Sequence, residues 1–286
     1  MKTLLVAVLA LLAVSCQPAA PPEATPQPAT TSAASQPAAL PHGITEEQFK
    51  AMHEAVSKPP APPTGQMIDL PGTSTRAYLS LPVGQAAPMP AITVIHEWWG
   101  LNDNVKHWAD RLAQEGYAAL AVDLYEGKVA TTPDEAMAAM QAVDPARARE
   151  ILLAAHRFLA TDASIQASKR GSIGWCFGGG QSLQLAIAAP DLDACVIYYG
   201  FLVTDPAQLA AIKAPICGIF ANKDQNITPA DVAAFDAGLT AAGVPHEIHG
   251  FDADHAFANP SGSRYDQPAA TAAWEKARAF LAAHLR

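Results

Sequence analysis

Residues 169–183 read KRGSIGWCFGGGQSL, and this stretch decides the fold of the chain. A short run that favours a β-strand, 171–174, leads into GWCFGG, and a segment compatible with a helix follows from residue 179. A tight turn from strand to helix pushes one side chain outward, and flanking glycines avoid a clash of Cβ atoms with the backbone. Cys176 occupies this turn. It is interpreted either as a nucleophile or as a buried cysteine that packs like a small hydrophobic residue.

From residue 67 onward, stretches typical of strands alternate with stretches typical of helices. The run AITVI at 91–95 is apolar throughout, which is typical of a strand buried on both faces. Such alternation predicts an α/β fold with a mostly parallel central sheet and helices on both of its faces. The predicted strands are 76–81, 91–95, 118–124, 171–174, 194–199, 216–220 and 246–251, and the predicted helices are 104–115, 131–140, 145–159, 179–189, 229–242 and 267–285.

The first 65 residues differ in composition from the rest. Residues 1–16, MKTLLVAVLALLAVSC, place one lysine before an apolar run and small residues, as a secretory signal does. Because it ends on Cys16, it resembles a bacterial lipoprotein signal, although an ordinary cleaved signal with an incidental cysteine is the alternative. Residues 17–65 form a linker rich in proline and alanine, with a short helix at 45–56, and 66–286 form the folded domain. We expect an exported protein of the bacterial cell envelope, attached to the periplasmic side of a membrane only through a lipid anchor.

Size and charge narrow the class of protein further. The chain has 286 residues, is 50% hydrophobic and carries a net charge of −9. This length is sufficient for one large domain, and the acidic balance with scattered basic residues argues against a nucleic-acid partner. We expect a monomer. Besides Cys176, the folded part contains Cys195 and Cys217 in apolar runs, where they are interpreted as core thiols or as a disulfide.

Candidate partners for Cys176 follow the predicted strands, because parallel sheets place their chemistry at the carboxyl ends of the strands. A thiol needs a base to become a thiolate, and the base needs a carboxylate that fixes its tautomer. In this architecture the chain order is nucleophile, acid, histidine. Cys176, Asp224 and His255 occur in that order, each just beyond a predicted strand. The alternative for Asp224 is an ordinary turn residue in NKDQN.

An acyl-transfer site also needs hydrogen-bond donors for the oxyanion of the substrate. The backbone N–H of Phe177, at the start of the helix after Cys176, is the first candidate. The second is the N–H of Trp98 in the loop after the strand at 91–95. Trp98 and Trp99 are also interpreted as a hydrophobic lid beside the pocket.

Histidines near the C-terminus raise the question of a metal ion. His246, His249 and His255 are close in sequence, but His246 and His249 point to opposite faces of one predicted strand. We therefore expect no metal site.

Four segments together, GWCFGGG, VIHEWWGLN, NKD and DHAF, resemble the dienelactone hydrolase family, a branch of the α/β-hydrolases, over nearly all of residues 67–286. The resemblance implies a triad of Cys176, Asp224 and His255, and a role for Glu97, which interacts with the resting cysteine and helps to generate the thiolate. It further implies hydrolysis of a lactone or small carboxylic ester, like that of a carboxymethylenebutenolidase, through an acyl-enzyme and without a cofactor. For Glu97 the alternative is a buried acid hydrogen-bonded to the loop backbone.

One position departs from the family pattern. The resemblance implies an arginine soon after the catalytic histidine to hold a substrate carboxylate, whereas this chain has Asn259. Arg264 is the alternative that could replace it, so recognition of a substrate carboxylate, and with it dienelactone as the substrate, is left open. Asn259 and Trp99 are assigned to the substrate pocket. Two alternatives to a lactone or ester hydrolase stay open: an envelope-anchored binding protein on the same fold, and a thioesterase or peptidase that uses the same triad.

Overall fold

The structure is a computed structural model, and it describes residues 62–286. The predicted signal at 1–16 with Cys16, the short helix at 45–56 and most of the linker at 17–65 lie outside the described residues. Within the described part of the chain, no helix combines the length and the apolar character needed to cross a bilayer.

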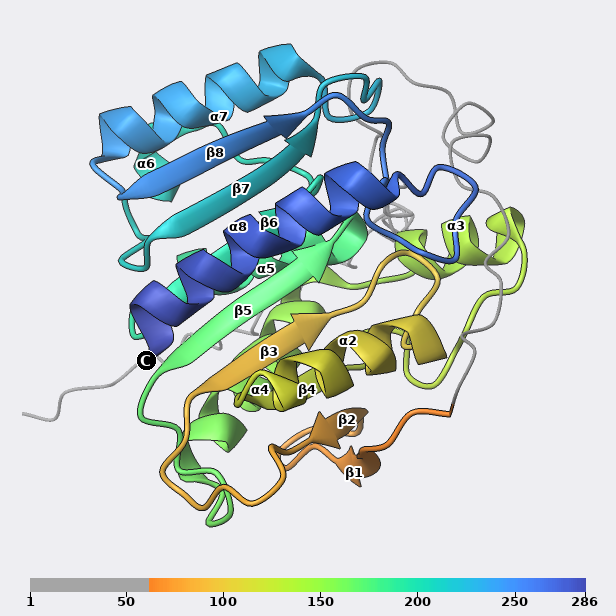
Figure 1. Cartoon of the computed structure of the whole chain (residues 1–286), viewed down its shortest axis with the longest axis vertical. Coiled ribbons are helices and arrows are strands. Elements are labelled where there is room, and N and C mark those ends of the chain that lie inside the picture. The colour runs from red at the N-terminus through yellow and green to blue at the C-terminus, as the bar shows by residue number, and fades with distance from the viewer. Residues whose placement is uncertain (1–61) are drawn as a thin grey trace, which may run out of the picture. The chain divides into compact units, whose positions relative to one another are not determined.

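Eight strands form one sheet in the order β1-β2-β4-β3-β5-β6-β7-β8 (Figure 1). From β4 to β8 the neighbouring strands are parallel, whereas β1 and β2 are antiparallel additions at one edge. The predicted α/β class and its mostly parallel sheet are therefore confirmed. The strands are β1 (Gln66–Asp69), β2 (Arg76–Ser80), β3 (Ala91–Ile95), β4 (Ala118–Val122), β5 (Arg170–Trp175), β6 (Ala194–Tyr198), β7 (Ile216–Ala221) and β8 (His246–Phe251).

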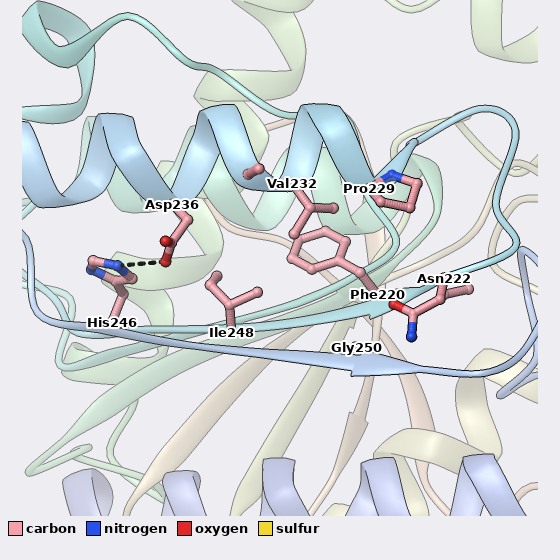
Figure 2. Close-up of a pocket in the computed structure, with 10 residues that line it drawn as sticks. Phe220, Asn222, Pro229, Val232, Asp236, His246, Ile248 and Gly250 are labelled. Carbon is pink, nitrogen blue, oxygen red and sulfur yellow. Dashed lines mark hydrogen bonds and ion pairs between the residues drawn. The ribbon is translucent and has the colours of Figure 1, made fainter.

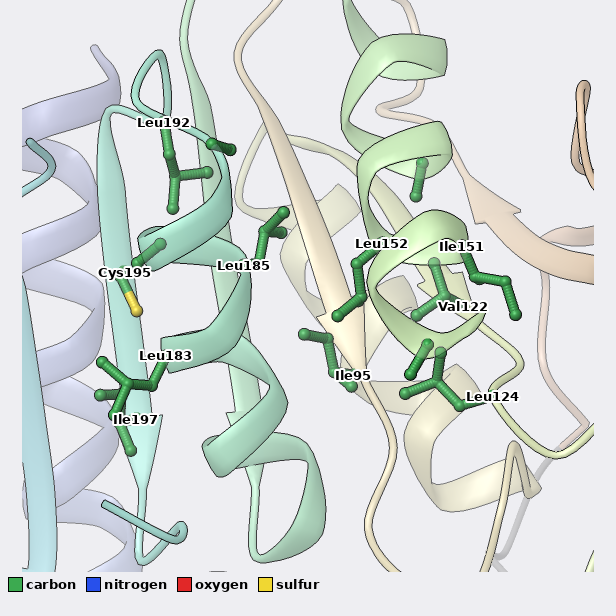
Figure 3. Close-up of a cluster of buried hydrophobic side chains, with 14 of the residues drawn as sticks. Ile95, Val122, Leu124, Ile151, Leu152, Leu183, Leu185, Leu192, Cys195 and Ile197 are labelled. Carbon is green, nitrogen blue, oxygen red and sulfur yellow. The ribbon is translucent and has the colours of Figure 1, made fainter. Parts of the chain in front are cut away.

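Helices cover both faces of the sheet, and the strands between them are apolar on both faces (Figure 1). Within β3, Ile95 packs into the buried cluster beneath α4 and α5 (Figure 3), while Ile92 and Val94 pack into a second cluster beneath α2 and α8. A continuous apolar strand is thus explained by burial on two sides. The helices are α2 (Asp103–Gln114), α3 (Pro133–Gln141), α4 (Pro145–Thr161), α5 (Phe177–Ala188), α6 (Pro206–Leu209), α7 (Pro229–Ala242) and α8 (Gln267–Leu285).

The connection from β5 to α5 is tighter than the sequence predicted, because α5 begins at Phe177 rather than at residue 179. Its glycines lie where no side chain fits. A Cβ atom on Gly178 would overlap the carbonyl oxygen of Ile95 and lie 2.5 Å from that of His96. The absence of a side chain at Gly178 therefore lets the first turn of α5 pack directly against the chain that leaves β3.

Candidate active site

Cys176 is the single residue between β5 and α5, and its backbone is strained. It has φ 53° and ψ −117°, a conformation that costs a non-glycine residue on the order of 1–3 kcal/mol. The fold holds it there: its N–H donates to the carbonyl of Tyr198 at 3.0 Å, and its own carbonyl accepts from Gly179 at 3.0 Å. The thiol is 3% exposed and makes no capping hydrogen bond to the helix. The turn therefore projects the sulfur away from the backbone.

His255 and Asp224 form a buried pair next to this turn. His255 Nδ1 lies 2.6 Å from Asp224 Oδ2, and both side chains are excluded from solvent. The other carboxylate oxygen of Asp224 accepts from the N–H groups of Asn226 and Ile227 at 2.8 and 3.0 Å. These bonds fix the carboxylate behind the ring, so Nδ1 carries a proton and His255 hydrogen-bonds Cys176 from its other side.

The charges of His255 and Asp224 stabilise each other. Burial alone would lower the pKa of His255, but the charge of Asp224 and the interactions with Cys176 raise it to about 10. Burial alone would raise the pKa of Asp224, but the charge of His255 and its hydrogen bonds hold it below the ordinary value. The Asp224 carboxylate therefore stabilises an imidazolium on His255 in the interior.

Glu97 follows β3, is buried, and lies close enough to His255 to interact with its charge. Burial raises its pKa to about 7, and the charge of His255 and a hydrogen bond from Asn259 limit that rise. Asn259 Nδ2 donates to Glu97 Oε2 at 2.7 Å, and Asn259 Oδ1 accepts from the N–H of Ser261 at 2.9 Å. Because the backbone N–H of Ser261 can only donate, the orientation of the Asn259 amide is fixed. Asn259 was assigned to the substrate pocket, and its amide is engaged by Glu97 instead.

His96 anchors the loop that carries Glu97, a role that sequence reasoning missed. Its Nδ1 lies 2.6 Å from the carbonyl oxygen of Glu97, and its Nε2 accepts from the N–H of Leu124 at 3.1 Å. These partners select the neutral tautomer with the proton on Nδ1, and burial lowers the pKa of His96 in agreement. The neutral ring thus ties the end of β3 to the chain after β4.

The two predicted oxyanion donors come from segments that touch. Phe177 opens α5, and Trp98 lies in the loop after β3, against which Gly178 packs. The rings of Trp98 and Trp99 are 0% and 3% exposed, stand 5.0 Å apart and belong to the buried cluster beneath α4 and α5. Both side chains are buried core residues in the structure, and their roles as a hydrophobic lid and, for Trp99, in a substrate pocket stay predictions.

Two buried tyrosines near Cys176 were not singled out from the sequence. The Tyr199 ring lies 5.1 Å from the ring of His255. Burial raises the pKa of both Tyr125 and Tyr199, and the charge of Cys176 raises both further. Tyr125 follows β4 and Tyr199 follows β6, so the rule that placed the triad candidates at strand ends also points to these two hydroxyls.

Two further features lie apart from this group. Cys195 and Cys217 are free buried thiols, so the disulfide alternative is wrong. A cavity of about 410 Å³ lies between α7 and the strands β7 and β8 (Figure 2). Its walls include Phe220, Val232 and Ile248, and none of the triad candidates lines it. The candidate site around Cys176 therefore lies at the carboxyl edge of the sheet and is separate from this cavity.

Comparison with known proteins agrees with the fold and with the strand-end motifs. The model of the dienelactone hydrolase family matches residues 75–285. A protein named usf from Aquifex pyrophilus is 34% identical over 232 residues, which cover 77% of this chain and 99% of the relative. A protein from Aquifex aeolicus assigned as a carboxymethylenebutenolidase is 32% identical over 233 residues, which cover 78% and 100%. The crystal structure of a protein from Klebsiella pneumoniae, described as a dienelactone hydrolase, superposes with a TM-score of 0.69 at 27% identity and covers 77% and 98%.

Proposed function

Because the chain belongs to the dienelactone hydrolase family and is a hydrolase that acts on esters, we propose that it cleaves a lactone or small carboxylic ester through a thioester on Cys176. One observation carries the proposal. The residue held in a strained conformation between β5 and α5 is a cysteine, and it hydrogen-bonds a histidine whose Nδ1 lies 2.6 Å from a buried carboxylate. A nucleophile in a strained backbone conformation, a base hydrogen-bonded to it and a carboxylate that orients the base are together the features of an activated nucleophile.

In the first half of the reaction, Cys176 Sγ attacks the carbonyl carbon of the substrate. The thiol proton passes to His255 Nε2, directly or by way of Glu97, and the negative charge moves to the carbonyl oxygen. The N–H groups of Phe177 and Trp98 donate to that oxygen, and the positive end of α5 adds to the stabilisation. His255 then gives a proton to the leaving alkoxide, the C–O bond breaks, and the acyl group remains on sulfur.

In the second half, water replaces the alcohol. His255 removes a proton from the water, which attacks the thioester carbonyl, and the C–S bond breaks to release a carboxylic acid and the thiolate. Asp224 stays ionised throughout, since it holds the Nδ1 proton and stabilises the imidazolium. Only acid–base groups of the protein act in these steps.

Glu97 has its own part in the resting enzyme. With a pKa of about 7 it is half ionised at neutral pH, so it can accept the thiol proton or hold one. The ionised carboxylate of Glu97 also interacts with His255, so it favours the imidazolium that forms when Cys176 gives up its proton. We assign to Glu97 the control of the ionisation of Cys176.

The partner of Glu97 bears on the class of substrate. Asn259 is neutral, and its amide protons face the glutamate. The side chain that follows the catalytic histidine in place of the expected arginine thus offers no positive charge to a substrate carboxylate. We therefore propose an uncharged ester or lactone as the substrate.

The proposal is tested by hydrolysis of activated short esters and lactones, with thioesters and peptides in the same panel. Cys176→Ala in the full chain should abolish ester hydrolysis and leave the circular dichroism unchanged. Cys195→Ala, which removes a buried thiol on β6 away from the triad, is the matched control and should retain activity. Unchanged turnover in Cys176→Ala would refute the nucleophile. A preference for thioesters or peptides over esters would redirect the substrate while keeping the triad.

We also propose that the chain is exported and anchored by a lipid on Cys16. The support is the signal-like segment that ends on Cys16, followed by a proline-rich linker. Fractionation of cells that express the full chain should place it with membranes, and Cys16→Ala should move it to the soluble fraction. An equal distribution of the two proteins would contradict the anchor.

A further inference from the structure

Cys217, Glu247 and His249 form a second group of chemically active side chains, here named the β7–β8 cluster. Their ligand atoms, one from each residue, all lie within 4.8 Å of one another. Cys217 is near the amino end of β7, whereas Asp224 follows the carboxyl end of the same strand. The cluster is therefore separated from the proposed active site by the length of β7.

Strand pairing explains how the three side chains meet. Cys217 is opposite Glu247 in the parallel ladder, and His249 is two residues further along β8, so all three point to one face. Figure 2 shows the other face of β8, where His246 and Ile248 point toward α7. His246 pairs there with Asp236 at 3.0 Å. The expectation of no metal site rested on His246 and His249 lying on opposite faces of one strand, whereas the neighbours of His249 are Cys217 and Glu247.

The polar groups of the β7–β8 cluster are only partly satisfied by one another. The Cys217 thiol hydrogen-bonds Glu247. His249 Nε2 lies 3.1 Å from Glu247 Oε1, yet this buried nitrogen makes no hydrogen bond of acceptable geometry. A buried ring nitrogen in this position loses about 1–3 kcal/mol relative to a satisfied one. A cation that uses its lone pair would remove that loss.

We propose that the β7–β8 cluster binds Zn²⁺ through Cys217 Sγ, Glu247 Oε1 and His249 Nε2, with a water molecule as the fourth ligand. Sulfur, nitrogen and carboxylate oxygen are the donors that Zn²⁺ selects, and three protein ligands leave one position of a tetrahedron to solvent. The water has access, because the side chains of His249 and Glu247 are 20% and 46% exposed. Binding replaces the S–H proton of Cys217, which is released to solvent.

The position at the sheet edge indicates a structural effect. β8 is the last strand of the sheet, and the ion would link it to β7 through side chains of both strands. One charge opposes binding: Lys276 on α8 is exposed and close enough to act on Cys217. Its replacement in Lys276→Met should therefore tighten Zn²⁺ binding, whereas a site without cation contacts would not respond.

The test adds Co²⁺ or Zn²⁺ to the purified full chain that carries Cys176→Ala. This variant lacks the active-site thiol, so that thiol cannot bind the ion. Co²⁺ should give a thiolate-to-cobalt charge-transfer band that disappears when Cys217→Ala is added. Calorimetry should show a loss of Zn²⁺ affinity of about tenfold or more for His249→Gln and for Glu247→Gln. Zn²⁺ should also raise the Tm of the chain with an intact β7–β8 cluster.

Two matched controls separate this site from general thiol or histidine binding. His246→Gln changes a histidine of the same strand on the opposite face, and Cys195→Ala removes a buried thiol on β6; neither should alter the band or the affinity. Should Cys217→Ala fail to fold, the variants of the partly exposed His249 and Glu247 still decide whether the cluster binds the ion. A band that survives Cys217→Ala, equal losses in His249→Gln and His246→Gln, or no binding by the parent chain would overturn the proposal.

Discussion

The hydrogen bond from Asn259 to Glu97 predicts how activity depends on pH. Asn259→Leu keeps the size of the side chain and removes the donor that lies 2.7 Å from Glu97 Oε2. A hydrogen bond to a charged group contributes about 1.5–3 kcal/mol, and about 1.4 kcal/mol corresponds to a tenfold change in a protonation equilibrium. This hydrogen bond lowers the pKa of Glu97, which is about 7 in the native protein. Its loss should raise that pKa by about one pH unit or more.

The consequence is a shift in the acidic limb of the pH profile, since the ionised form of Glu97 is the one that accepts the thiol proton. At pH 7 the ionised fraction should fall from about a half to about a tenth, so kcat/KM should fall about fivefold there. Above pH 9 the variant and the native enzyme should be equally active. Asn259→Asp places a second carboxylate beside Glu97 and should raise the pKa of Glu97 further. The acidic limb of the pH profile should then move further toward high pH.

The assay is kcat/KM for an activated ester from pH 5 to pH 10, with circular dichroism to establish that the variants are folded. Asn222→Ala is the matched control, because Asn222 is exposed beside the cavity at α7 and does not contact Glu97. An acidic limb that stays in place in Asn259→Leu would refute the reasoning. So would a lower plateau with an unchanged limb, since that result assigns Asn259 to something other than the ionisation of Glu97.

Three further predictions concern the same group. Because the pKa of Glu97 is about 7 in the folded state against an ordinary 4.5, its carboxylate destabilises the fold as pH rises from 4.5, fully so above 7, by about 3 kcal/mol. Glu97→Gln should therefore raise the free energy of urea unfolding far more at pH 8 than at pH 5, and equal gains would contradict this. Asp224→Asn should lower kcat by about four orders of magnitude, because the Nδ1 proton of His255 loses its acceptor; a loss below tenfold in kinetic assays would argue against the pair. Gly178→Ala should destabilise the fold by about 2–4 kcal/mol in denaturant titrations. Gly262→Ala, whose added Cβ would lie 3.6 Å from the carbonyl oxygen of Asn259, should have little effect.

The strand-end rule accounts for what the sequence could predict. Cys176, Asp224 and His255 are far apart in the chain, but parallel strands bring their carboxyl ends to one edge of the sheet. Glu97 also follows a strand, β3, but its role was implied by the resemblance to the family. The chain order of the three residues and the apolar runs that predict strands were sufficient to predict this grouping, because the topology of the sheet decides which strand-end loops lie side by side.

The missed features depend on loop conformation and strand register. The Asn259–Glu97 hydrogen bond joins residues 162 positions apart, and it follows from how two irregular segments turn. The β7–β8 cluster exists because Cys217 is opposite Glu247, and a register shift of one residue would separate them. No periodic pattern carries that information. The edge strand β1 was missed for a simpler reason, since four residues are too few for a clear alternation.

The central claim is that Cys176 carries the acyl group between the two halves of the reaction. It is tested most directly by rapid acid quench of the full chain during turnover of 4-nitrophenyl butyrate, followed by intact-mass and peptide mass measurement. The account predicts a butyryl adduct on the peptide that contains Cys176, formed in a burst with nitrophenol release and absent in Cys176→Ala. Turnover by the native chain with no adduct on that peptide, or an adduct that persists in Cys176→Ala, would contradict it.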